Sequence, residues 1–212
     1  MVEWQIALAL ASLRRVGGVR VVPIGFGPLA VVGLSGLRII PEGTFLTTKL
    51  ERRDLVLVPG GDVWERCEMA TMSAFLHRAG LFNTWIAGIG TGVIPIAYAR
   101  LLREREHSSN GRAEGSSWLE AYVQGYEGRA LHRPQSVTTS DRVTTAAGTA
   151  SFEFAAELLQ EFAGLRPEQL AAWRRLHANV SDGDASGMGP NSEPREPAQG
   201  LTRRGDVPRD RI

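Results

Sequence analysis

Apolar, β-branched stretches alternate with helical patterns along this chain, and the alternation limits the folds it can adopt. The run "LVLV" (55–58) ends on Pro-Gly-Gly, and a strand pattern over 84–89, "TWIAGI", passes without a linker into a helical pattern over 93–105. Apolar residues also recur at helical spacing over 4–15 and over 66–79, which Gly80 follows as a stop signal. Fully apolar strands between amphipathic helices are typical of a parallel sheet covered on both faces. The pattern predicts a three-layer α/β fold.

Weaker patterns predict the remaining elements. They are a strand over 17–25, a hairpin over 29–45 around "GLSG", a second hairpin over 136–148, and helices over 151–165 and 167–177. Beyond residue 177 the apolar pattern stops, and Gly, Ser, Pro and mixed charges dominate. Such composition does not support a packed core. We therefore predict one domain, residues 1–177, and a disordered tail, residues 178–212.

Charge and cysteine content exclude several partners. The formal net charge is +1, so no strong field points to nucleic acid or a membrane surface. The apolar N-terminal run contains Glu3 and Gln5 and ends early, which argues against a signal peptide or a membrane span. One cysteine, Cys67, allows no internal disulfide, so we expect a cytoplasmic protein. The spacing of the histidines suits no metal, and no cofactor is predicted.

The junction "IGTG" (89–92) is the candidate functional feature. A strand that turns directly into a helix places its corner residue at the carboxyl edge of the sheet, where ligands bind in α/β folds. That is the geometry of a nucleophile elbow, which normally carries Ser or Cys at its tip. Here the tip is Gly90, which has no side chain. A purely structural tight turn is the alternative, whereas a dinucleotide fingerprint is disfavoured because Pro95 stands where its third glycine belongs.

Five segments together resemble the ThiJ/PfpI superfamily, whose fold is the class I glutamine amidotransferase-like flavodoxin sandwich. They are "EWQIALALASL" (3–13), "DLVLVPGGDVW" (54–64), "IAGIGTG" (86–92), "HSSN" (107–110) and "VTTAAGTASFEFAAELL" (143–159). Each is similar to a segment of the family, and they follow the family's order. The resemblance covers about residues 3–177 and implies a flavodoxin-like, three-layer sandwich with a mostly parallel sheet.

The resemblance also implies roles for individual positions. The family's nucleophilic cysteine falls on Gly90, and its acidic partner falls on Gln5, while Glu3 is two residues early and should point elsewhere. His107 matches the family's histidine after the elbow helix. The backbone donors of the family's oxyanion pocket match Gly60, Gly61 and Thr91. Because these donors need only N–H groups, the pocket is expected to persist without its thiol.

The chain departs from the family a second time at its start. Family members begin with a central strand before the first helix, and this sequence has only Met1, Val2 and Glu3 there. Three explanations are open: a start codon farther upstream, a strand supplied by another chain, or a decaying gene copy. We favour the first or the last.

Three functional hypotheses follow, in descending order. The first is a non-catalytic, degenerate protein, a pseudoenzyme, that keeps a small-ligand pocket. The second is an active hydrolase, amidotransferase-like or glyoxalase-like enzyme that uses Cys67, Thr91 or His107 unconventionally. The third is an interaction module that acts as a homodimer, since dimers are common in the family. His77, His132 and His177 are predicted to be surface or capping residues.

Overall fold

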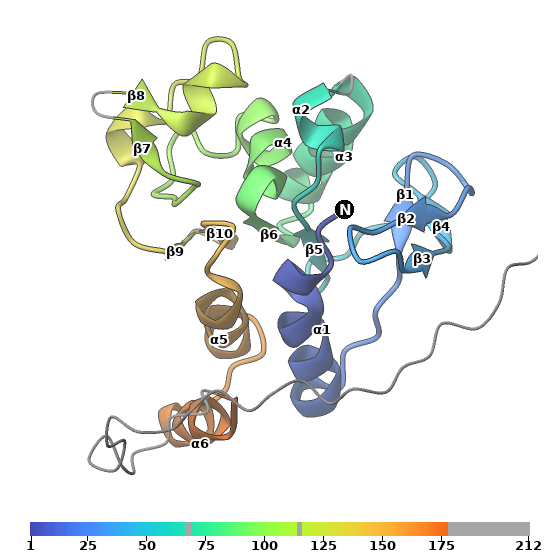
Figure 1. Ribbon diagram of the computed structural model, residues 1–212, viewed down its shortest axis with the longest axis vertical. Coiled ribbons are helices and arrows are strands. Elements are labelled where there is room, and N and C mark those ends of the chain that lie inside the picture. The colour runs from blue at the N-terminus through green and yellow to red at the C-terminus, as the bar shows by residue number, and fades with distance from the viewer. Residues whose placement is uncertain (67–68, 114–115, 178–212) are drawn as a thin grey trace, which may run out of the picture. The chain divides into compact units, whose positions relative to one another are not determined.

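A four-stranded sheet forms the centre of the structure, a computed structural model that describes residues 1–66, 69–113 and 116–177. The strand order is β5-β6-β10-β9, with β6 parallel to both neighbours and β9 antiparallel to β10. The strands are β5 (Leu55–Val58), β6 (Trp85–Ile89), β9 (Val137–Ser140) and β10 (Val143–Ala146). This sheet confirms the predicted strand at 55–58, the strand predicted over 84–89, which begins one residue later at Trp85, and the hairpin over 136–148 (Figure 1).

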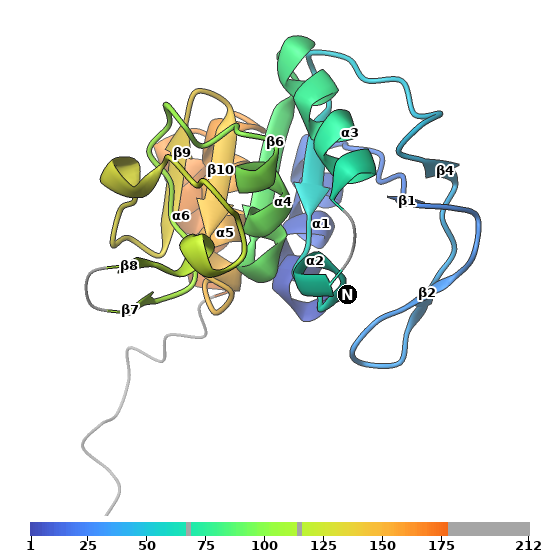
Figure 2. The same ribbon diagram turned by 90° about the horizontal axis from the view of Figure 1, so that it is seen from above.

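Helices cover both faces of this sheet (Figure 2). On one face, α3 (Ala70–Leu81) and α4 (Val93–Tyr98) contribute Phe75 and Ile94 to a buried cluster that includes Val56. On the other face, α1 (Trp4–Gly17) and α5 (Ser151–Glu161) contribute Leu13 and Phe154 to a second cluster. Successive side chains of a strand point to opposite faces of the sheet. Because helices cover both faces, the side chains on both are packed against helices. The predicted three-layer α/β sandwich is confirmed.

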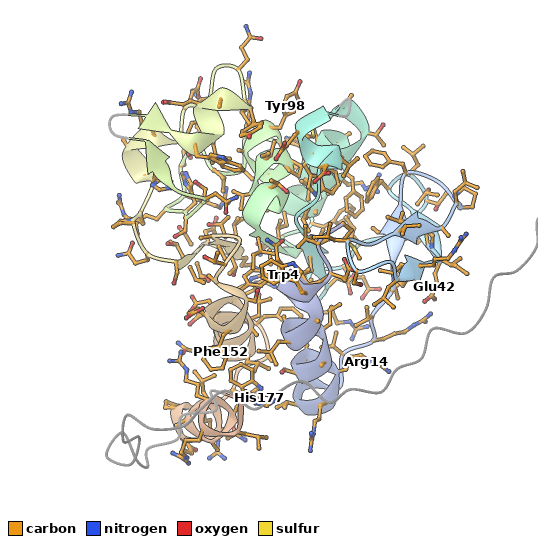
Figure 3. The ribbon with its side chains drawn as sticks, viewed as in Figure 1. Trp4, Arg14, Glu42, Tyr98, Phe152 and His177 are labelled. Atoms are coloured by element: carbon orange, nitrogen blue, oxygen red, sulfur yellow. The ribbon has the colours of Figure 1, made fainter. Side chains whose placement is uncertain are left out.

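Helix α6 (Pro167–His177) packs beside α5 and α1 through aromatic side chains. The indole N–H of Trp173 donates to Ser12 Oγ at 3.0 Å. Phe152 stacks on Trp173 with ring centroids 5.2 Å apart, and His177 stacks on the same indole at 4.7 Å (Figure 3). His177 therefore packs on an aromatic ring and stays exposed, as predicted.

The segment between α1 and β5 forms an excursion with two small sheets. Its strands are β1 (Ile24–Gly25), β2 (Val31–Val32), β3 (Arg38–Ile39) and β4 (Gly43–Thr44). β2 and β3 pair antiparallel, which confirms the hairpin around "GLSG". The strand expected over 17–25 shortens to β1, because its parallel register with β4 extends over only two residues. Phe45 anchors the excursion on α3 through Phe75, with ring centroids 5.3 Å apart, and Phe26 packs edge to face on Phe45 at 4.9 Å.

Two helices differ from their predicted limits. The helix expected over 93–105 ends at Tyr98, because Arg100 adopts a left-handed φ of 60° that interrupts the helix. The helix expected over 66–79 is divided into a short α2 (Val63–Arg66) and α3. α3 continues through Gly80 to Leu81, and the left-handed residue that follows it is Asn83, with φ 53°.

The N-terminus leads directly into α1: within the described residues, Met1–Glu3 form no strand before it. Residues Met1–His177 make one compact unit. The tail predicted to be disordered, 178–212, lies outside the described residues. In the part of the chain that is described, no helix is long and apolar enough to cross a bilayer. The remaining described elements are short. They are three 3₁₀ segments, η1 (Gly90–Gly92), η2 (Trp118–Ala121) and η3 (Arg129–Leu131), and one strand pair, β7 (Arg112–Ala113) and β8 (Ser116–Ser117).

Candidate functional site

The junction of β6 and α4 is a sharp corner at the carboxyl edge of the sheet. β6 ends at Ile89, η1 makes the turn, and α4 begins at Val93. Gly90 is buried and has a φ of +60°, a conformation that side-chain-bearing residues rarely adopt. A Cβ on Gly92 would lie 2.3 Å from the Val58 carbonyl oxygen, so the corner needs glycine there to approach the end of β5. The strand–corner–helix arrangement expected from "IGTG" is present.

The side chain of Gln5 lies inside this corner. Gln5 comes from the first turn of α1 and is only 6% exposed. Its Nε2 donates to the Gly148 carbonyl oxygen at 3.0 Å, and its Oε1 accepts from the Gly60 N–H at 3.1 Å. Gly60 follows β5 and Gly148 follows β10, so one amide connects the ends of the two strands that flank β6.

Gly90 faces that amide. A Cβ built on Gly90 would lie 2.8 Å from Gln5 Nε2 and 3.2 Å from the Cα of Gly148. The structure therefore brings together the two positions that the resemblance assigns to the nucleophile and its acidic partner. It also shows that the space for a first side-chain atom at the tip is largely occupied by Gln5.

The Gly60–Gly61 bend, which was expected to offer free backbone donors, has side-chain acceptors of its own. The Gly60 N–H is bonded to Gln5, and the Gly61 N–H donates to Thr91 Oγ1 at 2.7 Å. The Thr91 hydroxyl in turn donates to the Gly61 carbonyl oxygen at 3.2 Å. Gly60, Gly61 and Thr91 thus lie beside the corner as expected, but both glycine N–H groups are already paired.

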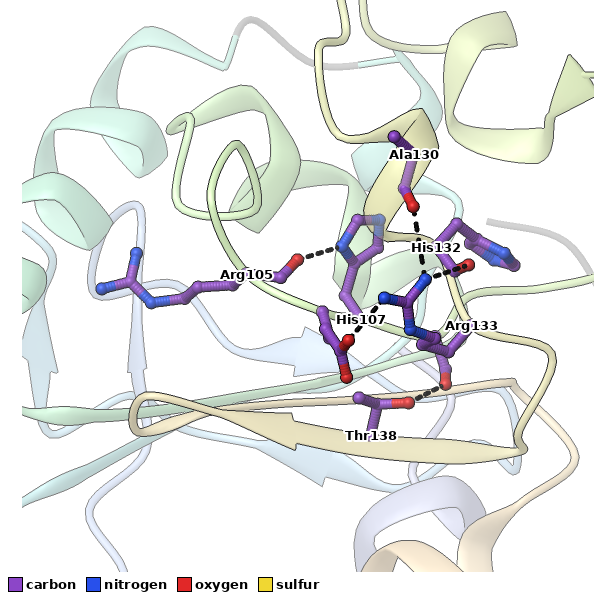
Figure 4. Close-up of polar contacts among 8 residues, drawn as sticks. Arg105, His107, Ala130, His132, Arg133 and Thr138 are labelled. Carbon is purple, nitrogen blue, oxygen red and sulfur yellow. Dashed lines mark hydrogen bonds and ion pairs between the residues drawn. The ribbon is translucent and has the colours of Figure 1, made fainter.

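His107 is fully buried in the loop after α4. Its Nδ1 lies 2.7 Å from the Arg105 carbonyl oxygen and must donate to it (Figure 4). This leaves Nε2 to accept from the Tyr126 hydroxyl. Burial lowers the pKa of His107, and the nearby charges of His132 and Arg133 lower it further. In the described part of the chain, neither Gln5 nor Gly90 is among its hydrogen-bond partners.

Asn110 is the residue of this loop that reaches the corner. Its Oδ1 accepts from the Gly148 N–H at 2.6 Å, and the Gly148 carbonyl accepts from Gln5. Asn110, Gly148, Gln5 and Gly60 therefore form one continuous hydrogen-bonded chain. Within the "HSSN" segment, only His107 had a role expected from the sequence. Asn110 and Gly148 carried no separate signal.

His132 is not a surface residue, contrary to the prediction. It is only 8% exposed, and its Nε2 lies 3.0 Å from Ser109 Oγ. It is buried because its backbone forms a bridge with His107, which holds the 130–133 segment against the loop at 107–110. Arg133 ties the same segments together through an ion pair with Glu106 (Figure 4).

Glu3, which was also considered from the sequence, lies away from the corner. The Glu3 carboxylate accepts from the backbone N–H groups of Leu34 and Ser35, at 2.8 and 2.6 Å, and from the Ser35 hydroxyl. These bonds, the hydroxyl first, lower the pKa of Glu3 to about 2. Glu3 thus points to the excursion, as expected. Cys67 lies outside the described residues.

Comparisons with known proteins agree with this architecture. Residues 1–161 match the model of the DJ-1/PfpI family. A curated relative, "Uncharacterized protease YoaZ" from Bacillus subtilis (strain 168), is 24% identical over 184 residues, which cover 84% of this chain and 86% of the relative.

Solved structures give the same fold. A thiJ/pfpI family protein from Bacillus anthracis superposes with a TM-score of 0.76 at 23% identity, covering 84% of this chain and 86% of that one. A DJ-1 superfamily protein from Agrobacterium tumefaciens superposes with a TM-score of 0.71 at 26% identity, covering 83% and 93%.

Proposed function

Because the chain belongs to the DJ-1/PfpI family, we propose that it is a non-catalytic member whose nucleophile pocket is closed from within by Gln5. The observation that supports this is the position of the Gln5 amide. It bridges the Gly60 N–H and the Gly148 carbonyl in the space toward which a side chain on Gly90 would point. The tip carries no sulfur. In a catalytic member the Gly60 N–H would donate to the oxyanion of the reaction, and here it donates to Gln5 Oε1.

The chemistry of an amide differs from that of the carboxyl group implied by the family. A carboxyl group can exchange a proton with a thiol, whereas an amide at neutral pH cannot act as a general acid or base. Gln5 can only donate and accept hydrogen bonds, and here it does both toward the backbone. The pair at positions 5 and 90 is therefore suited to connecting the ends of β5 and β10 and unsuited to covalent catalysis.

An active enzyme is the second candidate, because the relative from Bacillus subtilis is named an uncharacterized protease. The structural environments of Thr91 and His107, two of the unconventional catalytic groups considered above, weigh against an active enzyme. The Thr91 hydroxyl is bonded to both backbone groups of Gly61, and His107 is fully buried. Peptide or ester hydrolysis by this chain would therefore need a group other than these two.

Turnover assays separate the two candidates. We expect the purified full chain to hydrolyse neither a thiol-sensitive ester nor a peptide and to leave methylglyoxal unconsumed. Activity that disappears in Cys67→Ser would show that the chain is a cysteine enzyme and would overturn the proposal. Activity that survives Cys67→Ser would overturn it equally, because it would reveal another nucleophile.

A gain-of-thiol experiment tests the placement of the pocket. In a Cys67→Ser background, Gly90→Cys combined with Gln5→Glu should produce a thiol that reacts with peroxide at least about tenfold faster than an ordinary surface thiol. The control is Gly125→Cys, because Gly125 also has a positive φ, 70°, and has open space around it. Equal reactivity of the two thiols would show that the corner is no nucleophile pocket.

Homodimerisation and a cytoplasmic location complete the proposal, whereas the residual small-ligand pocket expected from the sequence is not proposed at the corner, because Gln5 fills that space. The family suggests the dimer, and the low net charge with a single cysteine suggests the compartment. Sedimentation velocity at micromolar concentration tests the dimer. Microscopy of a tagged full chain tests the location.

A further inference from the structure

Asn110, whose side chain reaches the corner, is followed directly by Gly111. Asn110 Oδ1 accepts from the Gly148 N–H at 2.6 Å, and the residue is only half-buried, so water can reach it. Gly111 is exposed, and a Cβ built on it would meet nothing within 4 Å. Among the described residues, none accepts a hydrogen bond from the Gly111 N–H. A side-chain amide and an unobstructed main-chain nitrogen are therefore adjacent in the chain.

These two groups can react with each other. The main-chain nitrogen of Gly111 attacks Asn110 Cγ, its proton passes to solvent, and the side-chain nitrogen takes up a proton and leaves as ammonia. The product is a five-membered cyclic imide, which water opens at either of its carbonyl carbons to give aspartate or isoaspartate. The net reaction consumes water, releases ammonia and needs no other reagent. Glycine in the second position favours ring closure, because it has no Cβ and its backbone is permissive.

Two hydrogen bonds stabilise the charges that develop during ring closure. The Gly148 N–H donates to Asn110 Oδ1, the atom that becomes an oxyanion when Cγ is attacked. The Ser109 hydroxyl donates to the Asn110 main-chain carbonyl oxygen, in a long bond of 3.4 Å. That carbonyl belongs to the peptide group whose nitrogen must lose its proton, so a donor to it favours deprotonation. Both bonds therefore promote the reaction.

Asn83 provides a contrast within the same chain. The residue after it is Thr84, which is β-branched and only 3% exposed. The Thr84 N–H donates to the Ala79 carbonyl oxygen at 3.0 Å. The nitrogen that would have to attack the Asn83 side chain is therefore both occupied and crowded.

We propose that Asn110 is a deamidation site, and that its two products have opposite effects on the hydrogen-bonded chain at the corner. In the aspartate product, a carboxylate oxygen takes the place of Oδ1 and accepts from the Gly148 N–H in a charge-assisted bond. In the isoaspartate product, the main chain runs through the former side-chain carbons and is longer by a methylene group, which displaces the carboxylate from Gly148. One product keeps the connection to Gly148 and the other releases it. This inference does not depend on whether the Gly90 corner is catalytic.

Mass spectrometry of the full chain after incubation at pH 8 tests the site. Trypsin releases residues 106–112 as one peptide, in which the replacement of an amide by a hydroxyl group marks deamidation and labelling by an isoaspartyl methyltransferase marks isoaspartate. We expect Asn110 to be converted at least about tenfold faster than Asn83. Gly111→Ala, at a position with open space, should fold normally and slow the conversion at least about tenfold.

Three results would overturn the assignment of the site. They are equal rates at Asn110 and Asn83, a rate that Gly111→Ala leaves unchanged, and protection of Asn110 by the fold. The blocked peptide Glu-His-Ser-Ser-Asn-Gly-Arg measures that protection, and the folded chain should react at no less than about a tenth of its rate. If Gly111→Ala does not fold, the comparison with Asn83 in the unmodified chain decides the question.

Amide hydrogen exchange followed by NMR tests the effect of the two products. Asn110→Asp supplies the aspartate product without the reaction, and its Gly148 amide should stay protected. In the isoaspartate form, isolated by chromatography, the Gly148 amide should exchange at least about tenfold faster than in Asn110→Asp. Equal exchange in the two forms would show that Gly148 is held without residue 110, and would overturn the proposed effect while leaving the site itself to the mass measurements.

Discussion

The first side-chain atom that Gly90 lacks would lie 2.8 Å from the amide nitrogen of Gln5. This distance is shorter than carbon and nitrogen normally approach without a bond between them. The two residues are therefore coupled: the amide can occupy its position only while position 90 is glycine. The absence of a side chain at position 90 and the position of the Gln5 amide are two aspects of one arrangement.

We expect Gly90→Ala to destabilise the chain for two reasons. Its φ of +60° costs an L-residue about 1–2 kcal/mol, and the contact with Gln5 adds to this. Urea unfolding of Gly90→Ala and Gly125→Ala separates the two terms, because Gly125 has a φ of +70° and no neighbour within 4 Å. Gly90→Ala should cost more than Gly125→Ala. The excess should shrink in a Gln5→Ala background, and an excess unchanged there would contradict the coupling.

Gln5→Glu should give a stability that depends on pH. Gln5 both donates and accepts, and a buried glutamate can do the same only when it is protonated. The folded state would therefore raise the pKa of Glu at this position above its unfolded value. Its contribution is fully present below the unfolded pKa and is lost as pH rises through the folded pKa. At pH 7 we expect a loss of about 1–3 kcal/mol relative to the unmodified chain, with a smaller loss at pH 5, measured by urea unfolding. An equal loss at both values would show that the carboxylate finds other donors.

The sheet and the corner were predictable because their signals are local. "LVLV" and "WIAGI" are apolar runs bounded by turn residues, and the glycines that permit the sharp turn are adjacent to the strand they end. Helix ends were less predictable: Arg100 and Asn83 adopt left-handed conformations that no neighbouring residue signals. The role of each helix in covering the sheet followed from its apolar spacing.

The position of the Gln5 amide in the corner was not predictable, because it depends on contacts between distant parts of the chain. Gln5 bonds to residues that are 55 and 143 positions away, and Asn110 meets a residue 38 positions away. Such pairings follow from the packing of α1 against α5, which no short pattern encodes. The burial of His132 has the same origin, since its bridge to His107 joins two loops.

His107 should make stability fall in mild acid. Its pKa lies below the ordinary value of 6.5, chiefly because burial disfavours the charged ring. For a histidine with a lowered folded pKa, the stability contribution is present above pH 6.5 and is lost as pH falls below it. Unfolding free energies should therefore decline from pH 7 to pH 5, and His107→Gln should reduce that decline. His77→Gln, at an exposed position of α3, is the control and should keep it. An identical decline in His107→Gln would assign the effect to other groups.

The Glu3 carboxylate should lose its low pKa when Ser35 is truncated. The Ser35 hydroxyl is the largest contribution to the pKa of about 2, ahead of the backbone bonds. In Ser35→Ala, the pKa of Glu3 should rise toward 4.5, which NMR titration of the side-chain carboxyl carbon measures. A folded pKa below the unfolded pKa stabilises the fold at pH values above the unfolded pKa, and this stability is lost as pH falls through the folded pKa. On acidification, the stability that the Glu3 carboxylate contributes should therefore be lost at a higher pH in the variant than in the unmodified chain. Ser136→Ala, at an exposed serine remote from Glu3 in sequence, should leave the titration unchanged. A pKa that stays near 2 in Ser35→Ala would show that the N–H groups of Leu34 and Ser35 suffice to hold the charge.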